Sequence, residues 1–229
     1  TKKRQLTRGA NSCSSPLWFP DGKKIAFLSS SKKTGDSDQD SKNQIFFMYV
    51  DGGEAWQVTE HKESIRYFRI SPDGTKIVFA SRDPLSKEEK EAQKKKDDEE
   101  VVDQDFRMTH LWLYDLKKEE EMRLTKGEFT VSGPRWSPDS SQIAYETRPN
   151  PKVDESWNSD IWVMQISTQK TSRLYENPGS DSSPRWSPDG RTIAFASDPH
   201  QGTNTWYKKL YMIPCEGGEP EILLKDFDL

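Results

Sequence analysis

Short apolar segments separated by turn residues recur along the chain with a period of about 50 residues. The first segment of each period starts with isoleucine, at Ile25, Ile77, Ile143 and Ile193. A second segment starts at Ile45, Leu111, Ile161 and Leu210, and a third is marked by Val58, Leu124, Leu174 and Leu223. Short apolar runs bounded by turn residues are typical of β-strands. The pattern therefore predicts a repetitive all-β protein.

A turn phrase precedes each first segment. Its four copies are Leu17-Trp18-Phe19-Pro20-Asp21-Gly22, Arg69-Ile70-Ser71-Pro72-Asp73-Gly74, Arg135-Trp136-Ser137-Pro138-Asp139-Ser140 and Arg185-Trp186-Ser187-Pro188-Asp189-Gly190. Proline presets the backbone of a tight turn, aspartate tolerates the next position, and glycine adopts the left-handed conformation that comes after it. The phrase therefore predicts a hairpin between the strand that carries the tryptophan and the first apolar segment. Ser140 replaces glycine in the third copy, which predicts a slightly strained turn.

Three of the four intervals in the repeat are constant. The third segment lies 13 residues after the second, the next turn aspartate 15 residues after that, and the isoleucine 4 residues after the aspartate. Only the interval between the first and second segments varies, at 20, 34, 18 and 17 residues. Each period therefore contains four antiparallel strands, the composition of one β-propeller blade. We expect the insertions to lie on one rim, and the tryptophan column to pack between neighbouring blades.

The repeat divides the chain into complete blades, expected at residues 16–63, 64–129, 130–179 and 180–229. Arg4-Gln5-Leu6-Thr7 matches the outer strand Trp56-Gln57-Val58-Thr59, so residues 1–15 are expected to end a preceding blade as an orphan outer strand. We therefore expect residues 1–229 to form a single, partial β-propeller domain, a fragment with an open ring. The alternative is a tight four-bladed ring in which the first and last blades touch and the extra strand lies outside. Uncovered blade faces and edges at the two ends predict self-association.

The longest variable interval lies in the second blade, between Asp83 and His110. Ser86-Lys87-Glu88-Glu89 forms a capping box, and the stretch to Lys96 favours a helix. We expect a short charged helix near residues 86–96 that is solvated on the rim. Docking of a partner or of another domain is the alternative role for this helix.

The insertion of the third blade carries the candidate contact residues. Arg148, Trp157 and Asn158 lie there among prolines, between Thr147 and Asp160. A tryptophan exposed beside amides could contact a peptide or a neighbouring domain. It could equally cover hydrophobic residues of the rim, because tryptophan is usually largely buried. These three residues are the candidates for contact with substrate or with another domain.

Composition excludes several function classes. Lys and Arg number 34 against 38 Asp and Glu, so the formal net charge is −4, and the basic excess of a nucleic-acid or anionic-membrane binder is missing. The chain is rich in aromatic residues, with 8 Trp, 7 Tyr and 10 Phe, which disordered chains avoid. Its longest apolar run, Ile45–Val50, is far too short to span a membrane. Cys13 and Cys215 fit neither a disulfide framework nor a zinc site, and leave the compartment open.

The sequence contains no recognisable catalytic or metal-binding arrangement. The G-x-S-x-G elbow of serine hydrolases is absent, and so is a glycine-rich phosphate loop. His61, His110 and His200 share no spacing that would pair them as metal ligands. The alternating aspartates of residues 36–40 lack the glycine and glutamate of a calcium loop. We expect no metal, no cofactor and no catalysis by this chain alone.

The repeated W-S-P-D-G and I-A-F phrase resembles the propeller repeat shared by the Tol-system periplasmic protein and the prolyl oligopeptidase family of serine peptidases. Two insertions point to the acylaminoacyl-peptidase and dipeptidyl-peptidase branch of that family. In the second blade, Val101-Val102-Asp103-Gln104-Asp105-Phe106 and His110-Leu111-Trp112-Leu113-Tyr114-Asp115-Leu116 look like that branch. In the third blade, Trp157-Asn158-Ser159-Asp160-Ile161-Trp162-Val163-Met164 is also similar to it.

The resemblance implies a propeller of about seven blades and, after it, a C-terminal α/β-hydrolase domain with a Ser-Asp-His triad. That propeller covers the active site, filters substrates by size and can hold the amino terminus of the peptide. The hydrolase domain would lie beyond Leu229, so no triad residue is assigned within this chain. The implied partners are a peptide substrate and the hydrolase domain. A stand-alone propeller of the Tol type, which binds other proteins, is the alternative. The resemblance implies an extracytoplasmic location, and the residues leave a cytoplasmic one open.

Overall fold

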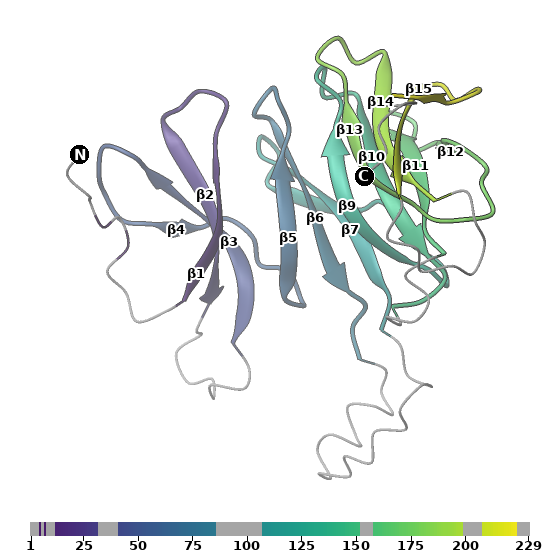
Figure 1. Cartoon of the computed structure of the whole chain (residues 1–229). Helices are drawn as coiled ribbons and strands as arrows, with labels where there is room; N and C mark the ends of the chain where they lie inside the picture. Colours follow the sequence, from purple (N-terminus) through teal and green to yellow (C-terminus); the bar gives the residue numbers. More distant parts are fainter. Residues whose placement is uncertain are drawn as a thin grey trace.

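The computed structural model describes residues 5, 7, 12–31, 41–85, 107–151, 158–198 and 208–223. In these ranges all regular secondary structure is β-strand, arranged in four antiparallel sheets of four strands each. The sheets succeed one another in sequence order as the blades of a β-propeller fragment (Figure 1). The predicted all-β propeller architecture is confirmed.

Every blade is a meander in which consecutive strands pair. The first contains β1 (Cys13–Trp18), β2 (Lys24–Ser31), β3 (Lys42–Tyr49) and β4 (Trp56–Gln57). The second contains β5 (Ile65–Ile70), β6 (Lys76–Arg82), β7 (Thr109–Asp115) and β8 (Glu120–Arg123). The third contains β9 (Thr130–Trp136), β10 (Gln142–Arg148), β11 (Asp160–Gln165) and β12 (Thr171–Arg173). The fourth contains β13 (Asp181–Trp186), β14 (Thr192–Ser197), β15 (Lys209–Pro214) and β16 (Glu221–Ile222).

The first strands of successive blades lie beside one another, β1 near β5, β5 near β9 and β9 near β13. They are therefore the strands that face the propeller axis. Their backbones bulge where the pairing register shifts, as between Ser14 and Leu17 and between Ser182 and Arg185. A bulge bends a strand and re-aims the side chains beyond it.

The turn phrase forms the predicted tight turn in all four blades. The left-handed position has a φ of 66° at Gly22, 67° at Gly74, 63° at Ser140 and 72° at Gly190. The strain predicted at Ser140 is thus confirmed, because a residue with a Cβ avoids this region. The Ser140 hydroxyl also accepts the backbone N–H of Asp73 at 3.1 Å, which links its turn to that of the preceding blade.

The turn aspartate organises its own loop. Asp139 accepts hydrogen bonds from the Ser137 hydroxyl at 2.6 Å, the Ser141 hydroxyl at 2.7 Å and the Ser141 N–H at 3.1 Å. The hydroxyl of Ser137 contributes most to holding the pKa of Asp139 below its usual value. Bonds of this kind stabilise the charged carboxylate and compete well with water. They explain why the sequence phrase alone fixes the turn.

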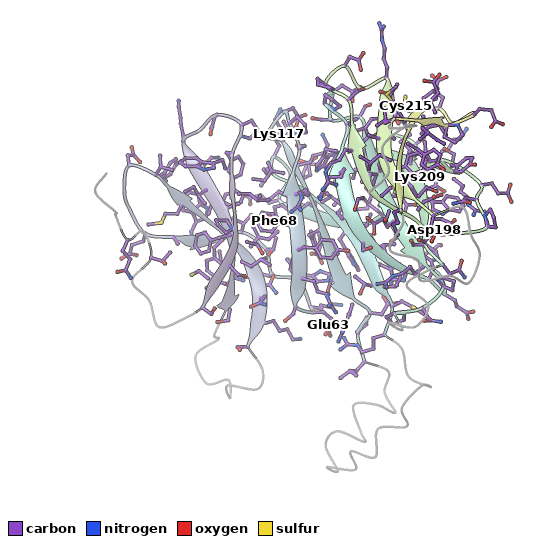
Figure 2. The ribbon with its side chains drawn as sticks, viewed as in Figure 1. Glu63, Phe68, Lys117, Asp198, Lys209 and Cys215 are labelled. Atoms are coloured by element: carbon purple, nitrogen blue, oxygen red, sulfur yellow. The ribbon has the colours of Figure 1, made fainter. Side chains whose placement is uncertain are left out.

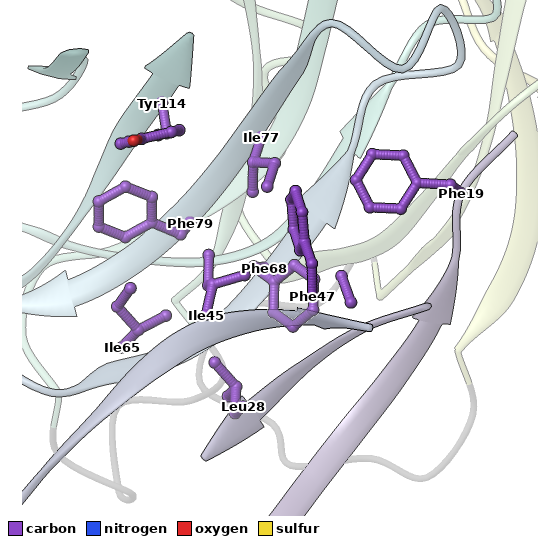
Figure 3. Packing of buried hydrophobic residues seen from close by; sticks show 10 residues of the cluster. Phe19, Leu28, Ile45, Phe47, Ile65, Phe68, Ile77, Phe79 and Tyr114 are labelled. Atoms are coloured by element: carbon purple, nitrogen blue, oxygen red, sulfur yellow. The ribbon is translucent and has the colours of Figure 1, made fainter. Parts of the chain in front are cut away.

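The hydrophobic core is divided into three clusters, one between each pair of neighbouring blades. Figure 3 shows the first cluster, in which Phe68 and Phe79 of the second blade meet Ile45 and Phe47 of the first. Along β6, alternate residues serve two clusters, since Ile77 and Phe79 face the first blade while their neighbours face the third. The packing of each blade against its neighbour therefore stabilises the fold, as in other repeat proteins.

The tryptophan column packs across blade boundaries at two positions. Trp136 donates its indole N–H to the Arg69 carbonyl at 3.1 Å, and Trp186 donates to the Arg135 carbonyl at 3.0 Å. Each tryptophan thus contacts the preceding blade, as predicted. The prediction is wrong for Trp18, whose side chain is 63% exposed because no described segment covers that face of the first blade.

The variable connections all leave the same end of the blades. They join the paired strand ends Ser31 and Lys42, Arg82 and Thr109, Thr147 and Asp160, and Ser197 and Lys209. We call this end the loop rim and the opposite end, which carries the turn phrases, the turn rim. Figure 2 labels Glu63 near the loop rim and Lys117 at the turn rim. The prediction that insertions gather on one rim is confirmed.

Two expected elements fall largely outside the described residues. The helix near residues 86–96 lies wholly outside them. Of the orphan outer strand, only Gln5 and Thr7 are described, and neither is in a strand. The Gln5 amide nevertheless donates to the Thr7 carbonyl at 2.9 Å, as Gln57 donates to the Thr59 carbonyl at 2.7 Å. This shared bond supports the sequence match between the two segments.

Candidate functional site

Three arginines occupy the same position on three consecutive innermost strands. Arg69 lies on β5, Arg135 on β9 and Arg185 on β13, each two residues before the serine of the turn phrase. Arg69 and Arg135 are half-buried, and Arg185 is exposed. The indole bonds described above attach to the Arg69 and Arg135 carbonyls, so they also fix the spacing of these backbones. We call the three side chains the axial arginines.

A repeated hydrogen bond holds each axial arginine in the same way. One guanidinium N–H donates to the carbonyl of the residue just before it: Phe68 at 2.9 Å, Pro134 at 3.1 Å and Pro184 at 2.9 Å. Within the described part of the chain, none of the three forms an ion pair with a carboxylate. Since a guanidinium carries five N–H donors, each side chain keeps donors for another partner.

The charges of the other axial arginines affect the pKa values of Arg69 and Arg135. Burial, and after it the charge of Arg185, lowers the pKa of Arg69. Burial, and then Arg69 and Arg185, lowers the pKa of Arg135. Arg69 and Arg185 belong to blades that are not neighbours, and the charge of Arg185 still lowers the pKa of Arg69, in keeping with the place of both residues on innermost strands. Three like charges are thus gathered in one place on a chain whose net charge is −4.

Glu146 on β10 is the acidic residue whose charge acts on this cluster: it raises the pKa of Arg135. Its carboxylate is already engaged. It accepts the Ser132 hydroxyl at 3.0 Å and the Ser183 N–H at 2.8 Å, which ties the bulge of β9 to the bulge of β13. Glu146 therefore braces two innermost strands and leaves the axial arginines without a direct carboxylate partner.

A groove lies on the turn rim between the third and fourth blades. It has a volume of about 360 Å³ and is lined by Pro138, Trp186 and Pro188 together with the carboxylates of Asp139 and Asp189. Trp186 connects the groove to the axial arginines, since its indole N–H is bonded to the Arg135 carbonyl.

Two of the three candidates predicted from sequence, Arg148 and Asn158, lie on the opposite rim. Arg148 is half-buried at the end of β10, and Asn158 is exposed just before β11. The pairing of Thr147 with Asp160 brings these two strand ends together. Trp157 lies outside the described residues. Arg148 and Asn158 therefore belong to the loop rim, away from the turn-rim groove.

One buried group has the composition of a hydrolytic triad. The His110 ring lies 3.1 Å from the Thr125 hydroxyl and 3.5 Å from the Asp83 carboxylate. The Thr125 hydroxyl is buried and accepts the Leu111 N–H at 2.9 Å. In the first blade, Thr59 accepts the Ile45 N–H at 2.9 Å in the same way. The group is therefore a repeated strand clasp, which closes the outer edge of a blade, and offers no nucleophile to a substrate.

Among the described residues, no three His, Cys, Asp or Glu side chains are arranged to hold a metal ion. In those same ranges no helix is long and apolar enough to cross a membrane.

Sequence reasoning did not predict the axial arginines as binding residues, because it interpreted their positions only as part of the turn phrase. The signal was present, since arginine begins the phrase in three of its four copies and leucine in the other.

The family model of the TolB beta propeller domain matches residues 100–223, more than half of the chain. Two relatives also match. The uncharacterized protein Atu1656 of Agrobacterium fabrum is 29% identical over 145 residues, covering 62% of this chain and 42% of the relative. The uncharacterized peptidase YuxL of Bacillus subtilis is 25% identical over 169 residues, covering 68% of this chain and 25% of the relative. The chain thus spans less than half the length of either relative.

Two solved structures show the same fold. TolB from Acinetobacter baumannii superposes with a TM-score of 0.57 at 18% identity, covering 93% of this chain and 43% of that one. The acylaminoacyl peptidase of Pyrococcus horikoshii superposes with a TM-score of 0.60 at 20% identity, covering 94% of this chain and 32% of that one. At such identities the likeness establishes the architecture alone.

Proposed function

The chain belongs to the TolB β-propeller domain family, and from this premise we propose that it is the non-catalytic propeller portion of a serine peptidase. In this role it gates access to an active site on another domain and helps to bind peptides. The Bacillus relative named as a peptidase supports the proposal, because the chain aligns with only a quarter of that protein. The remaining length leaves room for a hydrolase domain there.

The cluster of axial arginines is the observation that carries the binding role. It offers fixed cationic donors on the innermost strands, where a propeller admits ligands. The triad-like group of His110 is buried and already bonded, so it supplies no accessible nucleophile. A surface that binds without reacting suits a gate better than a catalyst.

We assign Arg148, Trp157 and Asn158 to contacts with the peptide or with the α/β-hydrolase domain. Arg148 and Asn158 lie on the loop rim, where all the variable connections gather. Variation concentrated on one rim suits a surface that meets different partners. Alanine substitutions of the three residues in the complete protein should raise KM for peptides and leave kcat unchanged.

The decisive experiment starts from the coding sequence beyond Leu229. A G-x-S-x-G motif in a strand–turn–helix context is expected there. The complete encoded protein should hydrolyse small chromogenic peptides and lose this activity with a serine-directed inhibitor, whereas residues 1–229 alone should be inactive. Inhibitor-sensitive hydrolysis by residues 1–229 alone would show that the propeller itself is catalytic. A complete protein without hydrolase activity would reject the peptidase role.

The alternative is a stand-alone propeller that binds other proteins, and the match of residues 100–223 to the TolB beta propeller domain family supports it. The two functions differ in whether a hydrolase domain lies C-terminal to the propeller. A coding sequence that ends soon after ring closure, without a hydrolase motif, would support the protein-binding role.

We also propose that residues 1–229 self-associate through the uncovered face of the first blade. Trp18 is 63% exposed there, and large uncovered apolar patches are rare on monomers. Light scattering at micromolar concentration should show a mass above that of the monomer, and Trp18→Lys should reduce it. A monomeric mass for the parent chain would contradict this proposal.

A further inference from the structure

The axial arginines form a cationic cluster that the fold holds in place and does not neutralise. Arg69 and Arg135 are half-buried, and Arg185 is exposed. Burial first, and then the charges of the other axial arginines, lowers the pKa of Arg69 and of Arg135, so gathering these charges is unfavourable. Proteins normally place a carboxylate beside such arginines, and here the nearest candidate, Glu146, is bonded to Ser132 and Ser183. A bound anion would supply the missing charge.

The donors that remain free suit a carboxylate. Each guanidinium uses one terminal N–H on its own backbone and keeps others, in a planar fork that matches two carboxylate oxygens. The tether to the preceding carbonyl orders the side chains before a ligand arrives, which lowers the entropy lost on binding. Two tryptophan indoles fix the backbones that carry Arg69 and Arg135.

The turn-rim groove, whose Trp186 is bonded to the Arg135 carbonyl, restricts what the anion can be attached to. Asp139 and Asp189 line it and would repel a polyanion, while Pro138, Trp186 and Pro188 offer apolar contact. A single carboxylate next to an apolar or basic side chain fits both parts. The carboxyl terminus of a peptide whose last side chain is not acidic has this chemistry.

We propose that Arg69, Arg135 and Arg185 form a binding site for the C-terminal carboxylate of a peptide, with the last side chain of the peptide in the groove of Pro138, Trp186 and Pro188. The choice of a peptide as the ligand rests on the peptide-binding function proposed above. The peptide is bound and released without a covalent step. The site lies at the turn rim, opposite the predicted contacts Arg148 and Asn158, so one peptide end would be held where the axis opens on that rim.

The test uses the full chain and a fluorescein-labelled, alanine-rich tetrapeptide ending in leucine, either as the free acid or as the C-terminal amide. Fluorescence anisotropy should show binding of the acid and little binding of the amide. Each of R69Q, R135Q and R185Q should weaken binding of the acid about 10-fold, as expected for the loss of a hydrogen bond to a charged group. R66Q is the matched control, because Arg66 is an exposed arginine on the same strand as Arg69; its affinity should not change.

A second readout keeps the proposal testable if a variant binds poorly for structural reasons. R135Q removes one of three mutually repelling charges, so its ligand-free melting temperature should equal or exceed that of the parent. The acid peptide should stabilise the parent more than it stabilises R135Q at the same peptide concentration. Equal binding of acid and amide would overturn the proposal, and so would unchanged affinity in all three variants.

Inorganic phosphate serves as a competitor that separates two anion sources. Displacement of the peptide only at phosphate concentrations far above the peptide's Kd supports the peptide assignment. Phosphate that binds as tightly as the acid peptide would overturn it and show a general anion site. Binding is measured directly, so a complete protein that binds the acid peptide but hydrolyses nothing would contradict the proposed peptidase role and leave this site intact.

Discussion

The first and third blades carry the same turn phrase but place its tryptophan in opposite environments. Trp18 is 63% exposed, whereas Trp136 is 8% exposed and bonded to the preceding blade. Their partners on the next strand differ likewise, since Ile25 is half-buried and Ile143 is fully buried. Both hairpins form, so the local sequence is sufficient for the turn and its strands. Burial of the tryptophan requires a neighbouring blade.

This difference shows where the stability of the chain lies. The three hydrophobic clusters are all shared between consecutive blades, and each takes side chains from both. A residue that faces a neighbour therefore stabilises an interface, whereas the same residue type on an open face stabilises little. Substitutions at matched positions of different blades can measure this effect.

The largest difference is expected between the two tryptophans. Trp136→Ala should lower the free energy of unfolding by about 3–5 kcal/mol, the usual cost of deleting a buried large aromatic side chain. At protein concentrations low enough to keep the chain monomeric, Trp18→Ala should change it by less than about 1 kcal/mol, as is usual for exposed positions. Urea denaturation monitored by circular dichroism measures both. Equal losses would mean that the open face of the first blade is covered in solution.

A second contrast concerns the bulges of the innermost strands. Gly133 has a φ of 57°, and a Cβ there would lie 2.8 Å from a carboxylate oxygen of Glu146. Gly22 has a similar φ of 66° with no atom within 4 Å of its Cβ position. Gly22→Ala should cost about 1–2 kcal/mol for the backbone strain alone. Gly133→Ala should cost more, because Glu146 must also move away from the bulge.

The double variant with Glu146→Ala isolates the steric part of this effect. In that background Gly133→Ala should cost no more than Gly22→Ala does in the parent. A Gly133→Ala cost that is unchanged by removing Glu146 would show that the clash is relieved elsewhere.

The strand clasp of the second blade contains a titratable side chain, His110, whereas the clasp of the first blade has Gln44 at the same position. Each of these two side chains is bonded to the threonine after the outer strand. Burial, the largest effect, lowers the pKa of His110 in the folded state below the usual 6.5, although Asp83 opposes the shift. The unfolded chain therefore binds a proton more readily, and stability should fall as the pH drops below about 6.5.

Replacing His110 with the residue of the first blade tests this pH dependence. His110→Gln should flatten the loss of unfolding free energy between about pH 7 and pH 5, measured by urea denaturation at each pH. A slope that His110→Gln leaves unchanged would assign the pH dependence to other groups. His61→Gln provides a comparison at another buried histidine.

Sequence reasoning succeeded where the cause was local and failed where it was not. The turn at Asp139 is held by serines within two residues, so its phrase could be read directly. The exposure of Trp18 depends on a blade that no local pattern reports. The axial arginines are separated by at least 50 residues along the chain and meet only because the innermost strands converge. The formal net charge of −4 does not indicate a cationic cluster, because acidic residues elsewhere in the chain outweigh the arginines.

The smallest expected effect concerns the one turn that lacks glycine. Ser140 has a φ of 63°, which a glycine would adopt without strain, yet its hydroxyl accepts the Asp73 N–H from the preceding blade. Ser140→Gly should therefore gain the relief of strain and lose one hydrogen bond, each worth about 1 kcal/mol, for a net change within about 0.5 kcal/mol. Ser140→Ala keeps the strain and loses the bond, so it should be less stable than the parent by about 1 kcal/mol. The denaturation midpoints of the two variants separate the contribution of the backbone strain from that of the hydrogen bond. If Ser140→Gly were clearly more stable than the parent, the bond between the turns would contribute nothing, and blade coupling at the turn rim would rest on the tryptophans alone.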